Sequence, residues 1–208
     1  MDAASLLQVE VTRFKQWASG ISLDTRSGEW ECDYPEWRSF WAAAKCLVET
    51  VPLATWTDAT TEDFVYALAR DNEVEVIADD LGSRSEALLT LAARALRSVE
   101  TDAKWQIAAK LGELNEHKLE AEALLIQFVQ DADEYVSRRS LLALGRLKSG
   151  KAEPFAERAW QTGHEYQRIA ALWALKDVQS SKLNDYLLLA EEDGREYVVC
   201  NAAEIRAG

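Results

Sequence analysis

Apolar residues recur at helical spacing along most of the chain, and this pattern predicts helices joined by short turns. The clearest case is the segment 131–147, in which an acidic turn precedes a helix with one apolar face. Asp131 and Asp133 suit the N-terminus of that helix. The apolar segment just before it, 121–130, predicts a first helix, so the two segments form a pair. The apolar face of the second helix consists of Val136, Ser140, Ala143, Leu144 and Leu147.

The helix pair is one copy of a repeat. A tyrosine that follows a glutamate occurs at Tyr135, Tyr166 and Tyr197, and the spacing is the same in both steps. Leu111 and Leu144 each begin a Leu-Gly-x-Leu sequence, and the spacing between these two leucines, one repeat earlier, is slightly longer. A fixed period of roughly 31 residues indicates stacked repeats, each with two helices of about three turns. The predicted pairs are 64–69 with 74–81, 84–98 with 102–115, 119–130 with 134–148, 152–162 with 165–178, and 182–192 with 195–206.

Two further helices are predicted before the repeats, at 4–18 and 35–50, and Thr60 to Asp63 resembles a capping box for the helix that follows. This N-terminal part is rich in tryptophan. A solenoid needs an atypical end to cover the apolar face of its first repeat. We therefore expect residues 1–60 to form a two-helix cap and residues 61–208 to form one continuous solenoid. The alternative is a dedicated binding loop around Trp30, within the acidic and aromatic segment 28–34. The tryptophans before residue 60 are Trp17, Trp30, Trp37, Trp41 and Trp56.

The segment 131–147, with its acidic turn, its valine, its small residues and its closing Ala-Leu-Gly-Arg-Leu, resembles the short bacterial form of the HEAT repeat. The segment 167–178 is similar and has Arg168 at the family's arginine position, where the earlier repeat has Ser137. The resemblance covers residues 62–206. It implies an all-α, right-handed α-solenoid of about five HEAT-like helix pairs, and it implies no particular activity.

Composition and charge narrow the choice of partner. The chain has 208 residues, of which 48% are hydrophobic, with only three prolines and nine glycines, as expected for long helices and short turns. It carries 23 basic and 36 acidic residues, for a net charge of −13. This charge repels nucleic acids and anionic membranes and attracts basic proteins, although it also serves simple solubility.

The three cysteines are far apart, so the sequence indicates neither a disulfide framework nor a zinc site. The N-terminus lacks the pattern of a signal peptide, and no stretch has the ~18 apolar residues of a membrane span. We expect a cytoplasmic protein without a cofactor. The sequence does not indicate an oligomeric state.

The second helix of each pair has a face opposite its packing stripe, and this face is the predicted binding surface. An exposed helical face is polar by default, yet several of these positions are apolar, which is typical of a protein-binding surface. The same pattern also fits burial of these side chains between adjacent helices. The acidic turns form a second candidate surface, or they serve only to cap helices and to pair with arginines. The predicted binding residues are Trp105, Arg138, Arg139, Leu142, Ile169, Trp173 and Glu204.

Catalytic chemistry has little support. His117 and His164 are the only histidines, and the chain has no nucleophile elbow, phosphate-binding glycine loop or metal motif. Some HEAT-like proteins are DNA glycosylases, and Trp105, Trp173, Arg138, Arg139 and Glu204 superficially resemble a glycosylase groove. Such enzymes need many basic phosphate contacts, which the charge of −13 disfavours. The sequence therefore predicts a non-catalytic interaction scaffold for a basic protein, for instance an immunity protein or inhibitor of a cationic toxin or nuclease. A glycosylase or another nucleic-acid-acting enzyme is the alternative.

Overall fold

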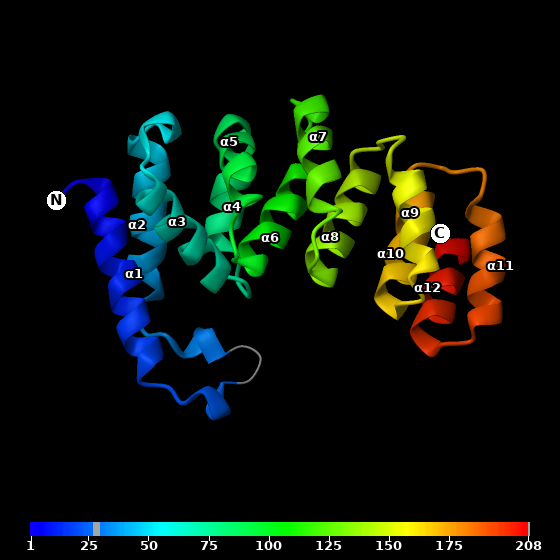
Figure 1. Cartoon of the computed structure of the whole chain (residues 1–208), viewed down its shortest axis with the longest axis horizontal. Coiled ribbons are helices and arrows are strands. Elements are labelled where there is room, and N and C mark those ends of the chain that lie inside the picture. The colour runs from blue at the N-terminus through cyan, green and yellow to red at the C-terminus, as the bar shows by residue number, and fades with distance from the viewer. Residues whose placement is uncertain (27–29, 208) are drawn as a thin grey trace. The chain divides into compact units, whose positions relative to one another are not determined.

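A computed structural model describes residues 1–26 and 30–207. Within these ranges all regular structure is helical, with twelve α-helices, three short 3₁₀ helices and no strand (Figure 1). Two N-terminal helices precede five helix pairs, as the sequence predicted. The α-helices are α1 (Ala3–Ser19), α2 (Trp37–Thr50), α3 (Asp58–Arg70), α4 (Val76–Gly82), α5 (Ser85–Ala95), α6 (Thr101–Leu111), α7 (Lys118–Phe128), α8 (Glu134–Arg146), α9 (Ala152–Gln161), α10 (Glu165–Asp177), α11 (Leu183–Asp193) and α12 (Glu196–Ala207).

The chain forms two compact units, Met1–Ile107 and Ala108–Gly208, with the boundary inside α6. Each unit is described by itself. The predicted division into a cap at 1–60 and a solenoid at 61–208 was drawn from the repeat pattern in the sequence, whereas these two units are defined by compactness. That division stays a prediction.

The first unit has an aromatic core at its N-terminal end. α1 packs against α2 and α3, and α2 also packs against α4. The fully buried ring of Phe14 lies 4.7 Å from the ring of Tyr34 and 5.5 Å from that of Phe40. Trp30, in the 3₁₀ helix Trp30–Asp33, stacks on Trp17 with ring centroids 5.6 Å apart. At Trp30 the structure therefore favours packing over a separate binding loop, and Gly28 and Glu29 of that predicted loop lie outside the described residues.

Two predicted helix starts in this unit were wrong by a few residues. The cap of α3 is Thr57, whose Oγ1 accepts a hydrogen bond from the Thr60 N–H at 3.1 Å, so Thr60 already lies inside the helix. α4 begins at Val76 instead of Val74 because Glu75 adopts a left-handed conformation with φ of 58°. The carboxylate of Asp71 accepts a hydrogen bond from the Ile77 N–H at 2.8 Å and thereby caps α4.

The second unit is a stack of helix pairs (Figure 1). The second helix of each pair forms a continuous layer, because α10 packs against both α8 and α12. α7 covers α8, α9 contacts α8 and α10, and α11 contacts α10 and α12. The side chains predicted for the inner face of α8 are buried, and Val136, Ala143 and Leu144 are fully so.

The repeat period is visible in the turns between paired helices. The side chains of Asp131, Thr162 and Asp193, which are evenly spaced along the chain, each accept a hydrogen bond from the backbone N–H two residues later. Gly163 and Gly194 both have a φ of 73°, the left-handed conformation in which glycine often closes a helix. The shared geometry places the first turn of α8, α10 and α12 in the same register.

Candidate protein-binding face

The predicted binding residues of the second unit lie on three adjacent helices. Arg138, Arg139 and Leu142 are in α8, Ile169 and Trp173 are in α10, and Glu204 is in α12. Because α10 packs against both of the other helices, the fold brings these residues onto one layer. Trp105 is in α6 and belongs to the first unit.

Trp105 is buried, with 6% of its surface exposed, and its indole N–H lies 3.2 Å from the Asp102 carboxylate that accepts its hydrogen bond. At this position the structure favours burial of the side chain between adjacent helices over a role in binding. The helical position of a residue is readable from the sequence, but its burial depends on how closely neighbouring helices approach.

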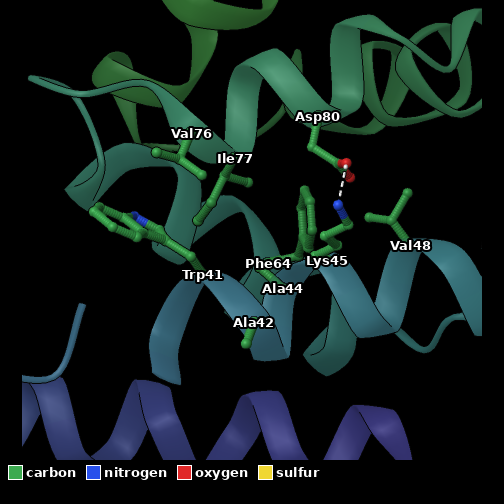
Figure 2. A pocket seen from close by; sticks show the side chains of 9 residues that line it. All are labelled: Trp41, Ala42, Ala44, Lys45, Val48, Phe64, Val76, Ile77 and Asp80. Atoms are coloured by element: carbon green, nitrogen blue, oxygen red, sulfur yellow. Dashed lines mark ion pairs between the residues drawn. The ribbon is translucent and has the colours of Figure 1, made fainter. Parts of the chain in front are cut away.

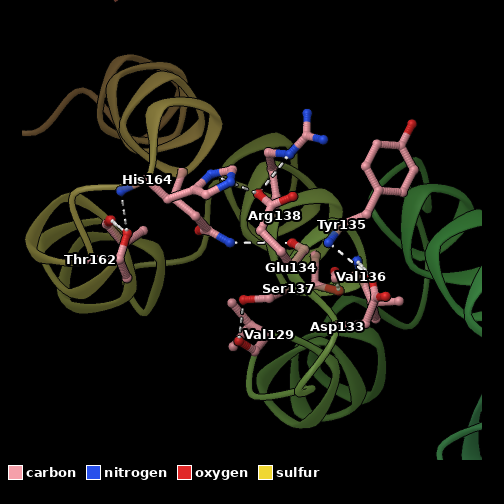
Figure 3. A network of polar contacts seen from close by, with 12 residues as sticks. Val129, Asp133, Glu134, Tyr135, Val136, Ser137, Arg138, Thr162 and His164 are labelled. Atoms are coloured by element: carbon pink, nitrogen blue, oxygen red, sulfur yellow. Dashed lines mark hydrogen bonds and ion pairs between the residues drawn. The ribbon is translucent and has the colours of Figure 1, made fainter.

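Arg138 lies between two tyrosines of consecutive repeats. Its guanidinium carbon is 4.6 Å from the ring centroid of Tyr135 and 4.9 Å from that of Tyr166. Its Nε donates a hydrogen bond to the Glu134 carboxylate at 3.0 Å. The Nδ1 atom of His164 lies 3.6 Å from the same carboxylate (Figure 3). Two aromatic faces and one carboxylate therefore hold a single guanidinium at the surface.

Local sequence explains this placement. Asp133 caps α8 by accepting hydrogen bonds from the N–H groups of Tyr135 and Val136, at 2.9 and 3.0 Å (Figure 3). With Val136 fixed in the core, Glu134 and Tyr135 fall on the outer side of the first turn. Arg138 is four residues after Glu134, which is the favoured spacing for an ion pair along a helix.

The three tyrosines form an exposed row, which we call the tyrosine edge. Their exposed fractions are 37% for Tyr135, 45% for Tyr166 and 59% for Tyr197. The regular spacing of the tyrosines is evident in the sequence. Binding, however, was predicted for other residues of the same helices. The exposure of three large aromatic side chains at equivalent positions is the feature that the structure adds.

The remaining predicted residues are partly or fully accessible. Leu142, Ile169 and Trp173 are half-buried, and Glu204 is exposed. The indole N–H of Trp173 donates a hydrogen bond to Asn201 of α12 at 2.7 Å. Trp173 thus joins α10 to α12 and also shows part of its ring on the surface.

The acidic turns mainly serve the fold. Glu100 pairs with Arg70 at 2.8 Å, and Asp193 pairs with both Arg168 and Arg195. Hydrogen bonds from Arg195 and then from Arg168 hold the pKa of Asp193 well below its usual range. Together with the capping role of Asp133, these contacts favour the structural interpretation of the acidic edge.

A small apolar pocket lies between α2 and α4 in the first unit and was not predicted. Its volume is about 140 Å³, and Figure 2 shows the side chains that line it. An ion pair between Lys45 and Asp80, at 3.7 Å, lies at its edge. Trp41 of α2 and Ile77 of α4 both line it, and Asp71 accepts hydrogen bonds from the Trp41 indole at 3.0 Å and from the Ile77 N–H. Burial raises the pKa of Asp71 to about 6.

The stacked helix pairs with a layer of second helices define the class of protein, an α-solenoid. A family model described as HEAT repeats matches residues 88–176 and 121–205, which together cover more than half of the chain. The chain belongs to the HEAT-repeat family. HEAT repeats generally act as scaffolds for protein interactions. No curated protein matches the chain. In the part of the chain that the structure describes, no helix combines the length and apolar character needed to cross a membrane.

Proposed function

We propose that this protein is a non-catalytic scaffold that binds a basic protein through the layer of α8, α10 and α12. The observation that carries the proposal is the tyrosine edge with Arg138 between Tyr135 and Tyr166. Tyrosine and arginine dominate the binding energy of protein interfaces and offer large contact areas at a low entropic cost. The three tyrosine side chains are exposed, so packing in the core does not explain why they recur at equivalent positions.

Charge supports a basic partner. The net charge is −13, and each tyrosine of the edge follows a glutamate. A positively charged surface would approach this protein faster than a neutral one. A cationic toxin or nuclease fits this description, and the protein would then act as its inhibitor or immunity protein by covering the cationic surface.

The contacts of Arg138 also weigh against the glycosylase alternative. A phosphate-binding arginine has to present its guanidinium to the nucleic acid, whereas Arg138 is paired with Glu134 and lies between two rings. Trp105, the other main resemblance to a glycosylase groove, is buried.

The test is capture of a partner by the full chain, followed by measurement of its affinity for matched variants. Tyr135→Ala and Tyr166→Ala should each weaken binding by roughly tenfold or more, because hot-spot truncations cost at least about 1–2 kcal/mol. Leu188→Ala is the control, since Leu188 is exposed on α11, outside the layer of α8, α10 and α12. Unchanged affinity of both edge variants for a captured basic protein would place the binding surface elsewhere.

A further inference from the structure

The structure shows how the tyrosine edge holds one cation. Arg138 fills the gap between Tyr135 and Tyr166, with ring centroids 4.6 and 4.9 Å from its guanidinium carbon. Glu134 supplies the neutralising carboxylate at 3.0 Å. A guanidinium over two aromatic faces gains from cation–π attraction, and its charge-assisted hydrogen bond to a carboxylate adds to that attraction. The chain thus demonstrates a guanidinium site with its own side chain.

The next interval along the edge, between Tyr166 and Tyr197, repeats the sequence positions of the first and lacks the arginine. Tyr166, Tyr197 and Glu165 stand one full repeat after Tyr135, Tyr166 and Glu134. At the position equivalent to Arg138 the chain has Ile169, which cannot supply a charge. α12 packs against α10 as α10 packs against α8, so the two gaps are flanked by equivalent helices.

The charges around the second gap leave its carboxylate available. Within the described ranges Glu165 forms no ion pair. Arg195 is near enough to interact with Glu165 electrostatically, but its guanidinium is held by Asp193 at 2.6 and 2.7 Å and donates to the Gly163 carbonyl at 3.0 Å. Tyr197 is the most exposed ring of the edge, with 59% of its surface accessible.

We propose that the gap between Tyr166 and Tyr197 is a binding site for an arginine side chain of the basic partner, with Glu165 as the paired carboxylate. This site specifies the chemistry of the proposed scaffold function and rests on it. Ile169, which is half-buried at the position equivalent to Arg138, would offer an apolar surface to the methylene stem of the incoming arginine.

The probe is a short peptide with one arginine, Gly-Ser-Arg-Ser-Gly with blocked ends, titrated into the full chain with isotope-labelled tyrosines. A single-residue contact has a Kd of roughly 1 mM, so the titration runs to ~10 mM peptide. Tyr166 and Tyr197 should shift in the NMR spectrum, and Tyr135 should shift much less because Arg138 already occupies its gap. The same peptide with citrulline, a neutral isostere, should cause no saturable shift.

Two variants make the test specific. Ile169→Arg places the missing guanidinium in the gap and should reduce peptide affinity at least tenfold. Tyr197→Ala should do the same with little effect on folding, because Tyr197 is exposed. Leu188→Arg is the matched control, with the same change of charge at an exposed position on α11 outside the proposed site, and should bind within about twofold of the parent protein because salt screens an exposed charge.

The outcomes separate this site from the general function. Three outcomes would each overturn the arginine site. Absence of tyrosine shifts at ~10 mM peptide would mean that arginine does not bind there. Equal binding of the citrulline peptide, or full binding by Ile169→Arg, would mean that binding does not depend on a positive charge in the gap. If a captured basic protein still depends on Tyr135 and Tyr166 while Ile169→Arg binds it normally, the scaffold stands and the second site does not. If the peptide binds as expected and a captured partner ignores all edge variants, the site stands and the proposed scaffold surface fails.

Discussion

A Cβ atom added to Gly112 would lie 2.7 Å from both the Cα and the Cβ of Ala143, closer than real Cβ atoms approach. The next repeat has the same relationship in a looser form, because a Cβ at Gly145 would lie 3.1 Å from the Cα of Ala174. The glycine of the Leu-Gly-x-Leu sequence thus allows the end of one second helix to approach the next second helix closely. This contact explains why the motif recurs with the repeat.

We therefore predict that Gly112→Ala destabilises the protein more than Gly145→Ala. Overpacking of a tight contact costs about 1–3 kcal/mol, and the tighter contact should lie at the upper end of that range. Gly150→Ala is the control, because nothing lies within 4 Å of an added Cβ and its φ is not positive. Urea unfolding of the three variants measures the difference, and equal midpoints for all three would show that the helices separate without cost.

Most of the fold could be predicted because the signal is repeated. The order of helices follows from an apolar face that recurs in each repeat, and Asp133 marks the start of α8 because it directly precedes the periodic residues. Thr60 misled the prediction because several threonines and acids cluster at 57–63, and any of them could cap a helix. Thr57 is the cap, and the preceding Trp56 packs against Phe64 with ring centroids 5.1 Å apart.

Asp71 should make stability depend on pH. It is 2% exposed, and burial raises its pKa from 3.8 to about 6 in the folded protein. A raised pKa means that the folded state favours the protonated acid. The stability from this group is therefore fully present below pH ~4 and is lost as pH rises through ~6, by about 3 kcal/mol in total.

Asp71→Asn tests this dependence because the amide does not titrate. The variant should be less stable than the parent at pH 4, since the amide oxygen cannot accept from both Trp41 and Ile77, which costs about 1–3 kcal/mol. The deficit should shrink or reverse between pH 4 and 7 as Asp71 of the parent ionises. The free energies of unfolding of both proteins in urea, measured across this range, give the comparison, and a constant deficit would contradict the raised pKa.

The pair of Arg168 and Asp193 should be transferable to the previous repeat, where Ser137 and Thr162 occupy the equivalent positions. The side chains of Ser137 and Arg168 each donate a hydrogen bond to a backbone carbonyl, Ser137 to that of Val129 at 2.8 Å and Arg168 to that of Trp160 at 3.1 Å. A pocket of about 230 Å³ lined by Ser137 and Thr162 provides room for the longer side chain.

The variant with both Ser137→Arg and Thr162→Asp should therefore have a higher free energy of unfolding than the sum of the two single-variant effects predicts. A partly exposed ion pair suggests a coupling of about 0.5–2 kcal/mol. A double-mutant cycle by urea unfolding measures this coupling directly. Strictly additive effects would indicate that the new pair does not form.

The binding face was less accessible to sequence reasoning than the fold. The position of Arg138 on the outer side of α8 could be predicted, but its contact with Tyr166 depends on how α10 lies beside α8. The burial of Trp105 likewise depends on packing between helices. The available signal was the regular spacing of the tyrosines, which indicates equivalent positions without telling whether they face solvent.

The net charge gives the last prediction, which concerns partner class. Approach to duplex DNA is repulsive for a chain of charge −13 unless a local basic patch outweighs it. Arg138 and Arg139 form a close basic pair on α8, yet Arg138 is paired with Glu134, and two arginines make too few phosphate contacts. We expect no measurable binding to DNA or RNA at ~150 mM salt, and an association rate with a basic protein that rises as salt is lowered. Fluorescence anisotropy with labelled duplexes and stopped-flow mixing at several salt concentrations measure the two quantities. Micromolar duplex binding at ~150 mM salt, or excision of a modified base, would support the glycosylase alternative instead.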